Sequence, residues 1–243
     1  MDDFFSQQTY VIAYIDVLGT TERIKHNPEK AIQDVWVYCH RTLKKSYNTK
    51  IKAKVFSDNI LICEEINELE PYQAIVDVLN VVHDLQTTMI NACSSFLRGG
   101  VTIGSMHCDE NFILGEGLLR AYELESKVAL FPRIVIDKPI FQYVKRNAPF
   151  FKRDFDGQYF YSFLYNAGYS YLDPQTKEQR YYVEWSNFKN RIIATMMQTK
   201  IPSVVQKMSW LINYLQDYFH SNNKEDLFSQ EELKLINNIL YNQ

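Results

Sequence analysis

The sequence has few of the features that mark secreted, membrane or metal-stapled proteins. Its four cysteines, Cys39, Cys63, Cys93 and Cys108, are dispersed and form no CxxC pair, which argues against a zinc site and a disulfide framework. No stretch approaches the ~20 consecutive apolar residues of a membrane span. The start of the chain is acidic where a signal peptide would be basic. We therefore expect a protein of the reducing cytoplasm with no membrane partner.

Blocks of basic residues are missing as well. The formal net charge is −3 at pH 7, and this balance argues against polymeric nucleic acid as a partner. Neither an internal repeat nor a low-complexity segment interrupts the chain. What remains is a sequence of 243 residues with 46% hydrophobic content, enough for one large domain or for a domain with an appended helical part.

Two aspartates stand out because of what surrounds them. Asp16 closes the apolar run of residues 10–15, and Asp58 lies between two apolar stretches that predict the arms of a hairpin. A carboxylate that ends a buried strand is costly unless it is paired or bound to a cation. Two such oxygen ligands on neighbouring strands are what Mg²⁺ or Mn²⁺ carrying a nucleotide phosphate would use.

The pattern of apolar residues predicts the order of the elements. The expected elements are a strand at 11–15 that is covered on both faces, a helix from Asn27, a hairpin at 52–63, a helix from Pro71, a hairpin at 96–114, a helix after Gly117 and a strand at 132–137. This order predicts an α+β fold, with a ferredoxin-like βαββαβ core and an antiparallel sheet backed by helices on one face. Residues 1–140 would form the first domain. Residues 141–243 would form an extension packed on it, with a hairpin at 151–164 and helices at 203–220 and 229–240.

Four segments together resemble the class III nucleotidyl cyclase domain over residues 11–137. They are Asp16–Gly19, Lys54–Asp58, Arg98–Gly104 and Gly115–Glu125, in the order and spacing of that family. Among its subgroups, the chain most resembles the short bacterial pyrimidine cyclases of anti-phage defence, the Pycsar cyclases. The shared features are the Arg-Gly-Gly strand and the Ala-Tyr-x-Leu-Glu helix that is followed by Pro-Arg-Ile.

This resemblance implies an enzyme and its mechanism. The enzyme would convert a pyrimidine nucleoside triphosphate, with UTP favoured and CTP possible, into its 3′,5′-cyclic monophosphate and pyrophosphate. Asp16, Asp58 and the carbonyl of Val17 would hold two divalent cations, Mn²⁺ or Mg²⁺, which activate the ribose 3′-hydroxyl for in-line attack on the α-phosphorus. The resemblance also implies a head-to-tail homodimer with composite sites and a separate effector that responds to the cyclic nucleotide.

The sequence departs from the purine cyclases on the helix after the second hairpin. Those enzymes carry an Asn there and, four residues on, an Arg that stabilises the transition state; the positions here are Leu119 and Glu123. Glu123 cannot donate to a phosphate. Arg120 is the nearest cation and is our candidate catalytic residue, with Arg98 and Arg133 as alternatives.

The positions that read the base differ too. Lys54 matches the position that reads adenine, whereas the second reading position holds Glu110 rather than Asp. With Leu119 and Tyr122 near the base, the pocket resembles neither purine reader. The candidate substrate-binding residues are therefore Lys54, Glu110, Arg98 and Tyr122, and the substrate favoured is a pyrimidine nucleotide.

Two other functions stay open. An adenylyl cyclase is favoured by Lys54. A catalytically silent, cyclase-like nucleotide-binding module is favoured by Leu119 and Glu123. Retention of both aspartates speaks against silence, since a degenerate site usually loses its metal ligands first.

Several of these residues also have a purely structural interpretation. Asp58 suits a turn, and Arg98 could pair with a carboxylate on its strand face. Glu125 would be a solvated residue on the surface of its helix. Gly100 and Gly104 are better explained by close packing or a bulge than by a phosphate contact.

Overall fold

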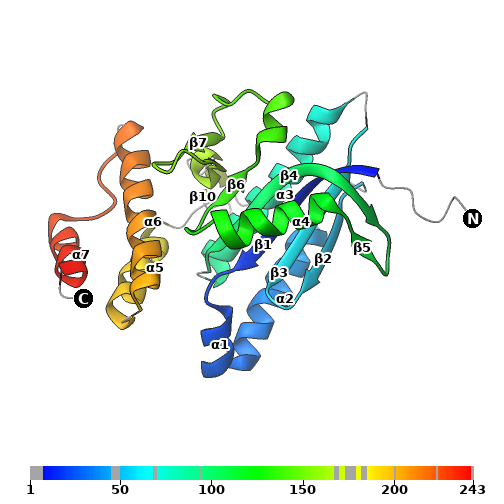
Figure 1. The fold of residues 1–243 in the computed structure, drawn as a ribbon. Helices are drawn as coiled ribbons and strands as arrows, with labels where there is room; N and C mark the ends of the chain where they lie inside the picture. The colour runs from blue at the N-terminus through cyan, green and yellow to red at the C-terminus, as the bar shows by residue number, and fades with distance from the viewer. Residues whose placement is uncertain are drawn as a thin grey trace, which may run out of the picture. The chain divides into compact units, whose positions relative to one another are not determined.

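The chain folds into an α+β structure, shown as a ribbon in Figure 1. The computed structural model describes residues 8–44, 50–67, 70–93, 95–166, 170–172, 179–181, 185–199, 201–222 and 224–241. The chain divides into two compact units, Met1–Tyr165 and Asn166–Gln243. All candidate site residues belong to the first unit.

The elements of the first unit follow the predicted order. Its strands are β1 (Gln8–Val17), β2 (Lys52–Phe56), β3 (Asn59–Glu65), β4 (Leu97–Cys108), β5 (Ile113–Leu114), β6 (Ile134–Ile136), β7 (Phe151–Arg153) and β8 (Tyr159–Tyr161). Its helices are α1 (Thr20–His26), α2 (Pro28–Lys44), α3 (Pro71–Cys93) and α4 (Glu116–Glu123), which continues into a π-helix over Leu124–Val128. Short 3₁₀ turns cover Lys138–Gln142 and Phe163–Asn166. The predicted order of strands and helices up to residue 137 is confirmed, except that α1 is an additional helix that the sequence pattern did not predict.

The strands of the main sheet lie in the order β2-β3-β1-β4-β6-β8-β7, and β5 pairs with β4 outside this path. The described pairs are antiparallel except β4–β6, which is parallel because α4 carries the chain back across the sheet. The predicted hairpin after residue 150 is present as β7 and β8, with Gly157 at φ 82° in its turn. The sequence placed this hairpin in the extension, but β8 pairs with β6 and so continues the main sheet.

Both faces of β1 are buried, and helices cover each of them. The residues Val11, Ala13, Ile15 and Val17 pack with α3 in one core, while Tyr10 and Ile12 pack with Met106 and Ala121 under α4 in another. Figure 1 shows α4 in front of the strands and α3 behind them. The expectation of helices on one face only is therefore corrected by α4. The physical reason is the unbroken apolar run of β1, which leaves no face that water could solvate.

Glycines allow α4 to lie close to β4. A Cβ added at Gly104 would be 2.6 Å from the Cα of Gly117, and one added at Gly100 would be 2.2 Å from the Cβ of Leu124. Contacts this short cannot form, so any larger residue would push the helix away from the strand. The packing interpretation of these two glycines agrees with the structure.

The second unit consists of a short hairpin and three helices. Its elements are β9 (Ser170–Leu172), β10 (Gln179–Tyr181), α5 (Trp185–Gln198), α6 (Pro202–Ser221) and α7 (Gln230–Tyr241). The capping box before α7 is formed, since the Ser229 N–H donates to Glu232 Oε2 at 2.8 Å and the Glu232 N–H donates to Ser229 Oγ at 3.2 Å. None of the helices in the described part of the chain combines the length and apolar character that crossing a membrane requires.

Candidate metal and nucleotide site

The end of β1 and the tip of the β2–β3 hairpin lie next to each other. Asp16 pairs in register with Asn59 on β3 and with Arg98 on β4. The Val17 N–H donates to the backbone carbonyl of Asp58 at 3.1 Å. The structure thus brings together the three residues that the sequence assigned to metal ions.

Local backbone geometry fixes these positions. Only Ser57 and Asp58 separate β2 from β3, and Ser57 adopts a φ of 57° to close this turn. After β1, the Thr20 hydroxyl donates to the Val17 carbonyl at 2.7 Å and so fixes the direction of that oxygen. A carbonyl oxygen has two lone pairs, so the Val17 carbonyl can still accept a second ligand.

Arg98 bridges two carboxylates. Its Nε donates to Asp16 Oδ2 at 2.9 Å, and its Nη2 lies 2.8 Å from Glu125 Oε1. Side-chain exposure falls from 25% for Arg98 to 16% for Asp16 and 4% for Glu125. Pairing of Arg98 with a carboxylate is therefore observed, whereas its contact with a substrate stays a prediction.

Glu125 is the member of this group that the sequence interpretation missed. It lies in the π-helix Leu124–Val128 and is buried instead of solvated. Burial raises the pKa of Glu125; Arg98 opposes this rise, and the negative charges of Asp16 and Asp58 add to it. Helical spacing could not have identified this residue, because the π-helix shifts the register of the residues after Glu123.

The donors at the end of β1 suit a hard divalent cation. They are the carboxylates of Asp16 and Asp58 and the Val17 carbonyl. Within the described ranges, no group of three or more His, Cys, Asp or Glu side chains is arranged to hold a metal. Mg²⁺ usually takes one or two protein carboxylates and completes its shell with water and substrate phosphates, so this small donor set fits an ion that arrives with a nucleotide.

Lys54 and Glu110 lie close together, and the observed contact joins the Lys54 ammonium to the backbone carbonyl of Glu110. The Lys54 ammonium donates to the carbonyl oxygens of Asp109 and Glu110 at 2.7 Å each. The turn is also held by Asp109, whose pKa is lowered to about 2 by the hydrogen bond with His107 and by two backbone N–H groups. The Glu110 side chain is exposed. The structure thus supports proximity of the two predicted base-reading residues.

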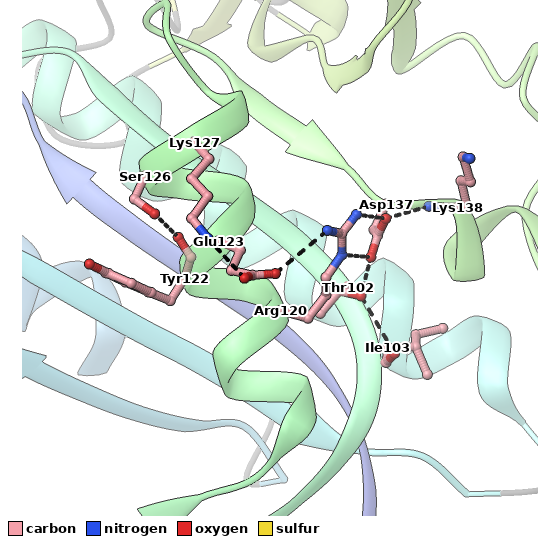
Figure 2. A network of polar contacts seen from close by, with 9 residues as sticks. All are labelled: Thr102, Ile103, Arg120, Tyr122, Glu123, Ser126, Lys127, Asp137 and Lys138. Atoms are coloured by element: carbon pink, nitrogen blue, oxygen red, sulfur yellow. Dashed lines mark hydrogen bonds and ion pairs between the residues drawn. The ribbon is translucent and has the colours of Figure 1, made fainter.

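Arg120 forms a two-pronged ion pair with Asp137, drawn in Figure 2. Its Nε and Nη2 each donate to Asp137 at 2.8 Å, and its Nη1 lies 3.9 Å from Glu123. Burial raises the pKa of Asp137, but the bonds from Arg120, Thr102 and the Lys138 N–H outweigh this and lower it overall. The Arg120 side chain is 47% exposed. Its candidate catalytic role stays a prediction.

Tyr122 lies on the side of α4 that faces β1. Its ring packs edge-on against Tyr14, with the ring centroids 5.7 Å apart. Tyr14 precedes Asp16 by two residues on the same face of β1. Leu119, one turn before Tyr122, is 60% exposed. Tyr122 is thus near the aspartate end of the strand, and Leu119 is open to solvent.

Arg133 is not available as a substitute for a transition-state arginine. Its side chain is fully buried and forms ion pairs with Asp154 and Asp156 in the turn between β7 and β8. An arginine that is sealed in this way cannot reach a bound phosphate. The alternative role for Arg133 is therefore corrected, because the residue anchors the hairpin to β6.

A cavity of about 580 Å³ borders the candidate site, since Thr20 and Ser57 are among its lining residues. It is lined by α1, α2 and β2, mainly with apolar side chains such as Ile24, Ile32, Val35 and Val55. Asp16 and Asp58 are not among its lining residues. The polar cluster, and not the apolar lining of this cavity, supplies the oxygen donors that a hard cation needs.

Known proteins give limited help. No protein family matches the sequence, and no curated protein matches it. The structure is similar to a dimeric guanylyl cyclase domain of the RhoGC fusion protein from the fungus Blastocladiella emersonii, with 13% identity, a TM-score of 0.47, and coverage of 65% of this chain and 98% of that one.

Two further solved structures are similar at the same low level. The guanylate cyclase domain of RhGC from Catenaria anguillulae, in complex with GTP, has 14% identity, a TM-score of 0.46, and coverage of 65% and 98%. A class III adenylyl cyclase-like ATP-binding protein from Pseudomonas aeruginosa has 11% identity, a TM-score of 0.41, and coverage of 58% and 36%. Similarities of this size assign neither a family nor an activity.

Proposed function

We propose that this protein is a metal-dependent nucleotidyl cyclase that forms a 3′,5′-cyclic nucleotide and pyrophosphate from a nucleoside triphosphate. The observation that carries this proposal is the meeting of Asp16, Val17 and Asp58 at the end of β1. Chain segments 42 residues apart supply the two carboxylates. A paired strand end and hairpin tip offer hard oxygen donors at one point.

In this proposal, each residue of the site would have a separate role. Asp16, Asp58 and the Val17 carbonyl would hold two divalent cations, Mn²⁺ or Mg²⁺, which supply charge neutralisation at the triphosphate and activation of the ribose 3′-hydroxyl. Arg98 takes one oxygen of Asp16 and thereby fixes the plane of that carboxylate. Thr20 fixes the direction of the Val17 carbonyl. Such preorganisation lowers the cost of assembling the site during the reaction.

We further propose a pyrimidine substrate, with UTP favoured and CTP possible. Lys54, Glu110 and Tyr122 would contact the nucleotide, and Leu119 would fill space that a purine needs. In this role the cyclic product would be a signal in anti-phage defence, read by a separate effector. An adenylyl cyclase is the second candidate, and the specific observation in its favour is that Lys54 lies within hydrogen-bond distance of the turn that carries Glu110.

A homodimer with composite sites is part of the proposal. Phe112 and Leu114 on the β5 arm and Leu119 and Tyr122 on α4 are large apolar residues with 46–62% of their surface exposed. Apolar residues gathered in this way often mark a protein interface. Arg120 would then act on a nucleotide held by the partner's aspartates, through the edge of its guanidinium that Asp137 does not occupy.

Product analysis tests the proposed reaction and its substrate. The protein is incubated with each of the four ribonucleoside triphosphates and Mn²⁺, and the products are identified by mass spectrometry. UTP or CTP should be turned over at least about tenfold better than ATP or GTP, because a mismatched base leaves buried polar groups unpaired at ~1–3 kcal/mol each. ATP as the best substrate would replace the pyrimidine proposal by adenylyl cyclase, and the absence of any cyclic product would reject the enzyme.

Subunit mixing tests the composite site. Asp16→Ala and Arg120→Ala are each expected to be inactive alone. A mixture should regain part of the activity, because a heterodimer contains one intact site and one doubly damaged site. No recovery despite demonstrated subunit exchange would exclude Arg120 from the site or place the whole site within one chain.

A further inference from the structure

Glu125 is a buried acid that contacts the candidate metal site only through Arg98. Its side chain is 4% exposed, and its Oε1 lies 2.8 Å from Arg98 Nη2. Among the described residues, this oxygen has no hydrogen-bond partner of good geometry, so the contact with Arg98 is an ion pair. A carboxylate buried in this way is costly.

Arg98 is held at both ends. Its Nε donates to Asp16 Oδ2 at 2.9 Å, and its Nη2 forms an ion pair with Glu125 Oε1 at 2.8 Å. A guanidinium is a rigid planar fork that pairs most strongly when two of its nitrogens meet both oxygens of one carboxylate. With Nη2 held by Glu125, Arg98 engages one oxygen of Asp16 through Nε alone.

We infer that Glu125 is a positioning residue for the candidate metal site: by holding Nη2 of Arg98, it prevents Arg98 from closing on both oxygens of Asp16 and keeps one oxygen for a divalent cation. This inference rests on the metal site of the proposed function. Glu125 itself neither ligates the ion nor contacts the nucleotide. Arg98 is the residue through which it acts.

The balance of charge leads to the same result. With all groups ionised, the carboxylates of Asp16, Asp58 and Glu125 and the guanidinium of Arg98 carry a net charge of minus two, which one divalent cation neutralises. If Glu125 loses its charge, the net charge is halved and Arg98 is released towards Asp16. The loss of negative charge and the release of Arg98 would both weaken cation binding.

A binding experiment without nucleotide turnover tests this inference. Mn²⁺ is titrated into the full chain, alone and with inorganic triphosphate, and free Mn²⁺ is measured by electron paramagnetic resonance. Glu125→Gln should weaken Mn²⁺ binding by about tenfold, the lower end of the effect of groups that orient metal ligands. The matched control is Glu116→Gln, the same change at an exposed position in the first turn of α4, which should bind Mn²⁺ like the wild type.

One more variant separates positioning from charge and from folding. Glu125→Asp keeps the charge but withdraws the carboxylate from Arg98, so it should also weaken Mn²⁺ binding. If Glu125→Gln does not fold, Glu125→Asp carries the test by itself. Normal Mn²⁺ binding by folded Glu125→Gln, or by Glu125→Asp alone, would overturn the positioning role.

The failure of this inference can be told apart from the failure of the proposed function. Wild-type protein that binds Mn²⁺ but forms no cyclic product would reject the cyclase and leave the role of Glu125 intact. Wild-type protein that binds no Mn²⁺ under either condition would reject the metal site and this inference together. If the variant merely loosened the fold, its thermal midpoint would fall along with its affinity.

Discussion

Two arginines in the first unit each bridge two carboxylates, yet their surroundings differ. Arg133 is fully buried, and both its partners, Asp154 and Asp156, lie in one hairpin turn. Arg98 is 25% exposed, and its partners come from β1 and from the helix after α4. The Arg133 bridge holds a hairpin turn in place, whereas the Arg98 bridge lies near the end of β1. Exposure and the origin of the partners, more than the type of ion pair, therefore distinguish a structural bridge from one at a candidate site.

Charge divides the two bridges as well. The Arg98 bridge has Asp58 beside it, so its acids outnumber its cation by two. Burial raises the pKa of Glu125 there, with Arg98 opposing the rise. In the Arg133 bridge, burial raises the pKa of Asp156, but the hydrogen bonds from Arg133 and from the Gln158 N–H, together with the positive charge of Arg133, outweigh burial and lower this pKa overall. With all groups ionised, the Arg133 bridge carries a net charge of minus one and the Arg98 bridge, with Asp58, carries minus two, so a cation is favoured more strongly at the Arg98 bridge.

The largest expected effect is on catalysis at the Arg98 bridge. Asp58→Asn keeps the shape and turn preference of the side chain but removes its charge. The rate of cyclisation should fall about 10³-fold or more, which corresponds to a loss of roughly 4 kcal/mol of transition-state stabilisation. The free energy of unfolding should stay within about 0.5 kcal/mol of the wild type. Initial rates and urea denaturation measure both quantities.

Asp226→Asn is the matched control for that variant. It makes the same chemical change at an exposed position in the second unit and should leave both quantities unchanged. Near-normal turnover by Asp58→Asn would show that Asp58 is not a metal ligand. The Arg98 and Arg133 bridges would then no longer differ in function.

The second effect is on stability at the Arg133 bridge. Arg133→Met leaves two aspartates near the surface of the core without their cation. Breaking a buried pair on one side costs about 3–5 kcal/mol, and we expect the lower end because Asp156 is 30% exposed and can regain water. Urea denaturation should show this loss. Cyclisation per folded molecule should be unchanged, and a large fall in that rate would mean that Arg133 serves the site after all.

Much of this arrangement could be predicted from the sequence. The apolar run before Asp16 and the turn residues around Asp58 are local signals, and they place both residues correctly at a strand end and a hairpin tip. The helix expected from Asn27 is α2, and Asn27 Oδ1 accepts the Lys30 N–H at 3.1 Å in its first turn. Signals of this kind need no knowledge of distant contacts.

The two bridges could not be predicted, because each depends on long-range packing. The side chain of Arg98 meets Glu125 only because α4 packs on β4, and the π-helix shifts the register of the residues that follow Glu123. Periodicity does not reveal a π-turn. Arg133 meets Asp154 and Asp156 only because β8 pairs with β6. A strand pairing of this kind has no local signature, and so the hairpin was assigned to the extension.

The ion pair between Arg120 and Asp137 is a third bridge, and we expect its loss to have an intermediate effect on stability. Arg120 is 47% exposed and Asp137 is 7% exposed, so the pair is intermediate between a structural bridge and one at a candidate site. Arg120→Met should cost about 1–2 kcal/mol of unfolding free energy, because Asp137 keeps its bonds to Thr102 and Lys138. Urea denaturation measures this change in unfolding free energy, and the rate of cyclisation shows whether Arg120 acts in the reaction. Loss of stability with normal turnover would assign Arg120 to the structural bridges, and a loss of turnover above about 100-fold would assign it to the site.

The smallest effect is the dependence of stability on pH, and it should have opposite signs at the two main bridges. The pKa of Asp156 is lowered on folding, so its pairing stabilises the protein above the ordinary aspartate pKa of ~3.9 and is lost as pH falls through the lower folded value. Asp156→Asn should therefore be less stable than the wild type at pH 7, by up to about 1 kcal/mol, and equal to it at the acid end.

The pKa of Glu125 is raised on folding, which reverses the sign. Its ionised form destabilises the fold above the raised pKa, and this cost disappears as pH falls to the ordinary glutamate value of ~4.3. Glu125→Gln, without added metal, should thus be as stable as the wild type or more stable at pH 7, and the gain should vanish near pH 4. Urea denaturation of both variants from pH 7 to pH 3 gives the two curves. A deficit of Glu125→Gln at pH 7 like that of Asp156→Asn would show that the Arg98 bridge is a structural bridge of the same kind as the Arg133 bridge.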